Sequence, residues 1–216
     1  QDVISMKTHT SMNTNILGQN MALVTAIGLI LSIVIPVALI SINSNQYSPT
    51  WGPLNNIVNF VQDLASVFTV VLAMKLFGAD EKPVFRVMSM VMIAVGTMWA
   101  IRDLAPTANA QSVFNQTLTA TEVAHIMGSF GFGSFVLLTI WFWTLLNADG
   151  GELIPRYAFM SGRAATILFV VLQVVGFFAK SLGLSQNLIA PLWLVGGLIL
   201  WPIAIYGVSR AFAKKL

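Results

Sequence analysis

The sequence predicts an all-α integral membrane protein, a six-transmembrane-helix bundle with both termini cytoplasmic and short loops. Its 216 residues are 56% hydrophobic and only 9% charged, whereas about a quarter of the residues of soluble domains are charged. Six segments are apolar over the roughly 20 residues that a membrane helix needs. Helices are the expected form of these segments because they satisfy their own backbone hydrogen bonds in lipid.

In chain order, the expected helices cover 21–43, 57–77, 84–102, 122–147, 162–182 and 187–208. Residues 1–20 are polar without an apolar period, so a flexible N-terminal tail is expected there. The first helix is too long for a signal-peptide core and is expected to remain in the membrane. Residues 209–216 form a basic tail. Whether residues 1–5 are native is left open, because Met6 is a candidate natural start.

Basic residues predict the orientation of the bundle. With both termini in the cytoplasm, that side holds nine Lys and Arg residues, against two on the other side, Arg102 and Lys180. The nine are Lys7, Lys75, Lys82, Arg86, Arg156, Arg163, Arg210, Lys214 and Lys215. Cytoplasmic loops of multi-pass proteins carry such an excess, and the plasma (cytoplasmic) membrane is the expected location.

The second expected helix carries a stripe of polar side chains within an otherwise apolar segment. At about 100° per residue these side chains fall within an arc of roughly 140°. The stripe consists of Asn55, Asn56, Asn59, Gln62, Asp63, Ser66 and Thr69. A carboxylate inside a membrane helix needs a partner or water, so Asp63 is the strongest site candidate in the sequence.

Other polar residues are expected at the same depth, in the third of the membrane nearest the outside. Arg102 and Asp103 end the third helix, Glu122 and His125 begin the fourth, and Lys180 ends the fifth. Gln173 lies seven residues before Lys180, on the same helical face. We therefore predict a polar cavity open to the outside, with Arg102 or Lys180 as the ionic partner of Asp63.

Each of these residues also has a purely structural interpretation, which the sequence leaves open. Asp63 could hold helices together through an ion pair. Arg102 with Asp103 could anchor the helix at the interface, and Glu122 could complete a helix-capping box. His125 could be a hydrogen-bonded packing residue, and Lys180 could extend towards the headgroups.

Several chemistries are excluded or disfavoured by composition. The absence of cysteine excludes disulfides, thiol redox chemistry and iron–sulfur clusters. A haem held by two histidines inside the bundle is excluded, because the only histidines are His9 in the tail and His125. The net charge of +3 is too small to indicate a nucleic-acid partner. No metal or other cofactor is expected, although a bound lipid is compatible with the sequence.

Three functions fit these observations. The favoured one is binding or translocation of a small polar or cationic solute, or a proton, at Asp63, with hydrogen bonds from Asn59, Gln62 and Gln173. The first alternative is a non-catalytic subunit or scaffold, in a homo-oligomer or a larger membrane complex. The second is an intramembrane enzyme that uses Asp63, Glu122 and His125 as acid and base on lipid headgroups. An enzyme is the least favoured of the three.

Overall fold

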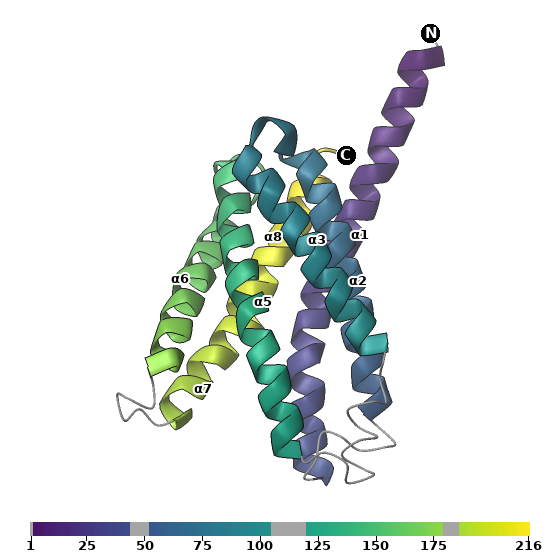
Figure 1. Ribbon diagram of the computed structural model, residues 1–216. Helices are drawn as coiled ribbons and strands as arrows, with labels where there is room; N and C mark the ends of the chain where they lie inside the picture. Colours follow the sequence, from purple (N-terminus) through teal and green to yellow (C-terminus); the bar gives the residue numbers. More distant parts are fainter. Residues whose placement is uncertain (1, 44–51, 105–119, 179–185) are drawn as a thin grey trace.

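A computed structural model of the chain describes residues 2–43, 52–104, 120–178 and 186–216, which are helical and contain no strand. Figure 1 shows the helices, separated by short turns or by segments outside the described ranges. They are α1 (Asp2–Asn43), α2 (Gly52–Leu76), the short 3-10 helix η1 (Ala79–Glu81), α3 (Pro83–Leu104), α5 (Ala120–Asp149), α6 (Arg156–Phe178), α7 (Gln186–Val195), the π-helical turn η2 (Gly196–Leu200) and α8 (Trp201–Ala213).

Five helical stretches within the described residues are long and apolar enough to cross a membrane. They are Asn13–Leu39, Leu54–Leu76, Pro83–Asp103, Arg156–Gly176 and Pro191–Ala213. These stretches indicate an integral membrane protein. Helix α5 overlaps the fourth expected segment, but its described apolar part, Ser134–Asp149, is shorter.

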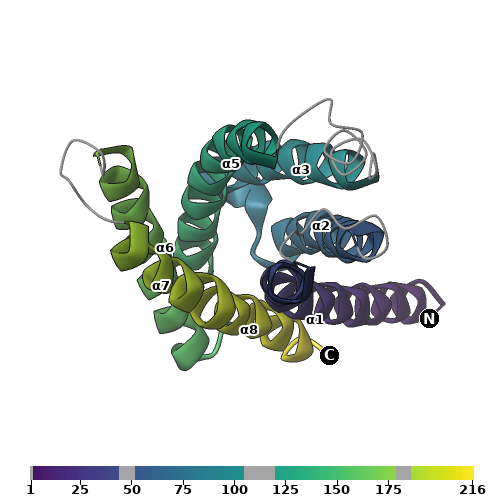
Figure 2. The same ribbon diagram turned by 90° about the horizontal axis from the view of Figure 1, so that it is seen from below.

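The long helices form a ring. Each packs against two neighbours, in the order α1, α2, α3, α5, α6, α8 and back to α1, an arrangement that Figure 2 shows end-on. Apolar side chains point outwards from this ring. On α2, for example, Ile57, Val61 and Phe68 are exposed, as expected for side chains that face lipid.

The structure differs from the expected polar tail over residues 1–20, because α1 begins at Asp2 and continues through that segment. Between residues 13 and 20 the helix makes two hydrogen bonds to α8 and the residues that follow it. Asn15 Nδ2 donates to the Lys215 carbonyl at 2.9 Å, and Ser209 Oγ donates to the Gln19 carbonyl at 3.0 Å. These contacts explain how a segment without an apolar period remains helical.

The last expected helix is interrupted in the structure. Between α7 and α8 the chain forms the π-helical turn Gly196–Leu200. Gly196 lies so close to the Phe169 ring of α6 that an added Cβ would be 2.4 Å from it. Ser161 of α6 donates to the Leu200 carbonyl at 2.9 Å. Helix α6 therefore packs closely against this turn and supplies one of its carbonyls with a donor.

Interleaved aromatic rings hold the second half of α5 to α6 and α8. The Phe142 and Trp201 rings meet edge to face, with centroids 4.8 Å apart. Phe169 lies 5.8 Å from Trp201 by the same measure. All three side chains are buried, and pairs with this geometry stabilise a core beyond their burial alone.

Two turns at one end of the bundle are tied together. In the α2–α3 turn, Gly78 has a φ of 65°, a conformation that favours glycine. Lys82 Nζ donates to the Phe77 carbonyl of its own turn at 2.9 Å and to the Ala148 carbonyl of α5 at 2.5 Å. In the α5–α6 turn, Asp149 accepts hydrogen bonds from three backbone amides. The C-terminus lies at this same end (Figure 1).

Candidate functional site

The polar stripe of α2 faces the protein. None of its seven side chains is exposed, and Asp63 is only 8% exposed. Gly96 allows α3 to come close at this level, because an added Cβ would lie 2.7 Å from the Val67 side chain of α2. Helices α2 and α3 therefore pack with little space between them beside Asp63.

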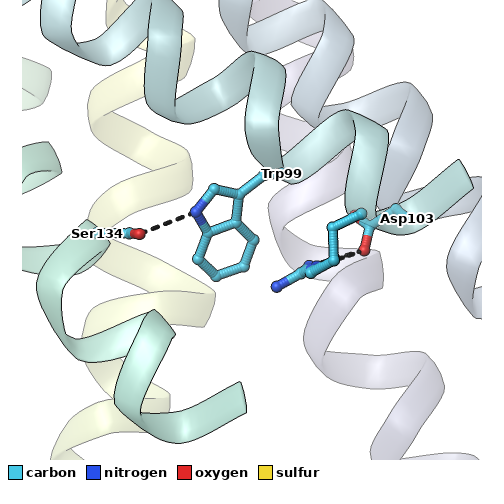
Figure 3. Close-up of polar contacts among 4 residues, drawn as sticks. Trp99, Asp103 and Ser134 are labelled. Atoms are coloured by element: carbon cyan, nitrogen blue, oxygen red, sulfur yellow. Dashed lines mark hydrogen bonds and ion pairs between the residues drawn. The ribbon is translucent and has the colours of Figure 1, made fainter. Parts of the chain in front are cut away.

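An ion pair lies near the end of α3, at the level where the chain leaves the helix. Arg102 donates to Asp103 Oδ1 from Nη2 at 2.7 Å and from Nε at 3.0 Å. The guanidinium carbon also lies 3.9 Å from the centre of the Trp99 ring, a distance at which the ring attracts the cation. Trp99 in turn donates from its indole nitrogen to Ser134 Oγ of α5 at 2.9 Å. Figure 3 shows both contacts, with Trp99 between the ion pair and α5.

Asp63 meets this ion pair from the neighbouring helix. Its buried carboxyl group lies in the electrostatic environment of the Asp103 carboxyl, the Arg102 guanidinium and the Gln62 amide. Arg102 bonds to Asp103 rather than to Asp63. The expected partnership of Asp63 with Arg102 is thus indirect, through a second carboxyl group.

Some polar atoms near the group lack a partner among the described residues. Asp103 Oδ2 and Asn59 Oδ1 are buried and accept no hydrogen bond from a described donor. Asn59 lies one helical turn before Asp63, on the same face of α2. An unpaired acceptor in a buried place raises the free energy of the folded state.

Asp63, Asp103 and Arg102 together contain more acidic than basic groups. Two carboxyl groups share one guanidinium, so the group carries one negative charge when both are ionised. A hydrogen bond between two carboxyl groups needs one proton, because an ionised carboxylate only accepts. Among the described residues, no three His, Asp or Glu side chains form a cluster that could hold a metal ion.

The remaining candidate residues do not all join this group. Glu122 and His125 belong to α5, but their side chains lie outside the described ones, and Lys180 lies outside the described residues altogether. Gln173 was expected to supply a hydrogen bond at Asp63, and this expectation stays a prediction. Its side chain lines a cavity between α5 and α6, whereas Asp63 lies between α2 and α3.

Two residues of the site were underrated in the sequence analysis. Asp103 was expected in the outer polar region or as an interfacial anchor with Arg102, and Trp99 was expected only as an aromatic residue near the outer interface. Trp99, Arg102 and Asp103 are spaced i, i+3 and i+4, so they share one face of a helix. That spacing was the available signal, but nothing in the sequence indicated that this face would meet Asp63.

Comparison of the chain with protein-family models, curated proteins and solved structures finds no match.

Proposed function

We propose that the chain is a six-span protein of the plasma (cytoplasmic) membrane that binds and translocates protons or small cations through Asp63 and Asp103. The observation that carries this proposal is the surplus of acid in a buried group. A purely structural ion pair needs one carboxylate for one guanidinium, and Arg102 already has Asp103. Asp63 then requires a proton or cation of its own.

The count of six spans is supported by the length of α5. Its 30 residues extend about 45 Å at 1.5 Å per residue, more than the roughly 30 Å of a hydrocarbon core.

The orientation of the bundle is supported by the distribution of charge. Lys82, Arg86 and Arg156 lie at or next to the two tied turns, and Lys214 and Lys215 lie at the C-terminus. These five favour the cytoplasm for that end.

In this orientation Asp63 and the ion pair lie in the half of the bundle nearer the outside. The Arg102 side chain is 23% exposed and the Asp103 side chain 6%, so the group extends from the surface of α3 into the α2–α3 contact. A proton that arrives from outside would meet Asp103 first and Asp63 second. Asn59 and Gln62 would then hydrogen-bond to an ion held at Asp63.

The alternative is a non-catalytic subunit in which the same group only holds helices together. Close contact between α2 and α3 at Gly96 and the burial of both acids favour this view. In that case the proton would stay in place, and replacement of the Asp63 carboxyl by an amide would leave every activity unchanged. The two functions therefore give opposite results for one substitution.

Proton flux in reconstituted liposomes provides the test. The purified protein is reconstituted with a pH-sensitive dye inside, and a potassium diffusion potential drives proton entry. Wild-type protein is expected to acidify the interior faster than protein-free liposomes, and Asp63→Asn is expected to abolish the difference. Asp80→Asn is the matched control, because Asp80 has a 94% exposed side chain outside the candidate spans; this variant should behave as wild type.

A second measurement detects proton binding when flux needs an unidentified co-substrate. Infrared difference spectra should contain the band of a protonated carboxyl group, and Asp63→Asn and Asp103→Asn should each change it. Normal flux in a well-folded Asp63→Asn variant would refute the proposal. No protonated carboxyl band in the wild type, together with a partner that co-purifies in fixed stoichiometry, would establish the scaffold function instead.

A further inference from the structure

A cavity of about 490 Å³ lies between α5 and α6, away from the acidic site. Its walls are mostly aliphatic, with Val136 and Ile140 from α5 and Val170 and Val174 from α6. Small-molecule sites have volumes of roughly 300–1,000 Å³ and mainly apolar walls with a few polar groups. The cavity therefore has the size and lining of a site for an apolar ligand.

One polar group in the cavity has no partner in the described part of the protein. Gln173 is 6% exposed, and its Nε2 is buried without a described acceptor. Thr139, the other polar lining residue, already donates to the Phe135 carbonyl of its own helix at 2.7 Å. An unsatisfied amide donor in an apolar place is costly, so the occupant should bring an acceptor for Gln173.

The occupant should come from the lipid phase. Val170, Val174 and Ile140 line the cavity and are also about half exposed on the outer surface of the bundle. In a bilayer this surface faces acyl chains rather than water. A water-soluble ligand would have to cross lipid to reach the cavity, whereas a lipid is already beside it.

The position of Gln173 along α6 fits a phospholipid. Helix α6 ends at Phe178, which also lines the cavity, and Gln173 lies about 7.5 Å below it at 1.5 Å per residue. Ester carbonyls of phospholipids lie where the headgroups meet the hydrocarbon core, near the ends of membrane helices. From Phe178 to Val170 the cavity wall extends about 12 Å, which suits the upper part of one acyl chain.

We propose that the α5–α6 cavity binds one acyl chain of an ester-linked glycerophospholipid, and that the ester carbonyl of this lipid accepts a hydrogen bond from Gln173 Nε2. The lipid would fill the aliphatic part of the cavity and satisfy the unpaired amide at the same time. This site is independent of Asp63, so the two proposals can fail separately.

A comparison of diester and diether phosphatidylcholines tests the proposal directly, because the diether lipid lacks the carbonyl acceptor. The protein is reconstituted in an equimolar mixture of the two, and lipids that remain bound are identified by native mass spectrometry. The wild type should retain the diester lipid over the diether lipid by about twofold to tenfold, the factor that one hydrogen bond provides. Gln173→Leu should bind both lipids equally.

A bulky side chain in the cavity tests whether an acyl chain occupies it. Val170→Trp should displace the retained lipid, because Val170 lines the cavity. Val171→Trp is the matched control, since Val171 is the next residue, does not line the cavity and is equally exposed, at 50% against 49%. This control should retain lipid as the wild type does.

Two results would overturn the proposal. One is a wild-type protein that shows no preference for the diester lipid, or a preference that Gln173→Leu leaves unchanged. The other is a second copy of the chain in the cavity. Because the chain contains no cysteine, Val174→Cys introduces a single thiol, and rapid disulfide formation between copies in the membrane would show that the face is a protein contact.

Discussion

Removal of the Arg102 guanidinium is the most informative perturbation of the acidic site. Arg102→Gln deletes two charge-assisted hydrogen bonds to Asp103, at 2.7 and 3.0 Å, and leaves a buried carboxylate beside Asp63. Each such bond is worth about 1.5–3 kcal/mol. Breaking a buried ion pair from one side costs about 3–5 kcal/mol, and this is the loss of unfolding free energy that we expect.

A second substitution, Asp103→Asn, removes the carboxylate that Arg102→Gln leaves without its ionic partner. In Arg102→Gln with Asp103→Asn, no unpaired carboxylate remains at position 103, so the loss should fall to about half that of Arg102→Gln alone. Asp63→Asn should cost only about 1 kcal/mol, because an amide can still donate to Asp103. This last expectation distinguishes a protonated Asp63 from an ionised one.

Unfolding in detergent micelles, followed by tryptophan fluorescence, measures these differences. The fluorescence of Trp99 itself reports on the site, since its ring lies against Arg102. An unfolding free energy of Arg102→Gln within about 1 kcal/mol of the wild-type value, the range of a surface ion pair, would show that the Arg102–Asp103 pair is not energetically buried. A double variant as unstable as Arg102→Gln alone would contradict the attribution of the loss to the unpaired Asp103 carboxylate.

Two further predictions concern helix packing and a turn elsewhere in the bundle. Gly207→Ala should destabilise the α6–α8 contact by about 1–3 kcal/mol, because the new Cβ would lie 2.2 Å from Ala158 Cβ. Gly176→Ala, where an added Cβ meets no described atom within 4 Å, should be neutral or stabilising by up to about 1 kcal/mol; equal melting temperatures for the two variants would contradict the contact. Asp149→Ala should cost about 2–4 kcal/mol by leaving the amides of its turn without an acceptor, and a melting temperature unchanged from wild type would show that water replaces the carboxylate.

The helices were predictable because their signal is local. A run of about 20 apolar residues must form a helix in lipid wherever it lies in the fold, and the expected segments overlap the observed helices. The expected and observed structures differ where contacts between distant residues outweigh the local polarity of the sequence. The first 20 residues lack an apolar period, yet α1 begins at Asp2, and Asn15 and Gln19 are hydrogen-bonded to Lys215 and to Ser209 of α8. The close approach of Gly196 to Phe169 coincides with the π-helical turn.

The candidate site was predictable only in part. The inward-facing stripe on α2 follows from spacing alone, because seven polar residues within one arc cannot all face lipid. Gln173 was grouped with Asp63 because both were expected at similar depth, but depth does not say which helices are neighbours. In the ring, α6 packs against α5 and α8, and Gln173 lines a cavity between α5 and α6.

By itself the sequence determined the membrane class, the approximate helix bounds and the buried face of α2, since each depends on the polarity of residues close together in the chain. Only the tertiary structure decided that Asp63 meets Asp103 and that Arg102 pairs with Asp103 first. It also decided that Gln173 lines a cavity between α5 and α6. Those facts depend on the order of helices around the ring and on the close approach at Gly96, and both arise from contacts between residues far apart in the sequence.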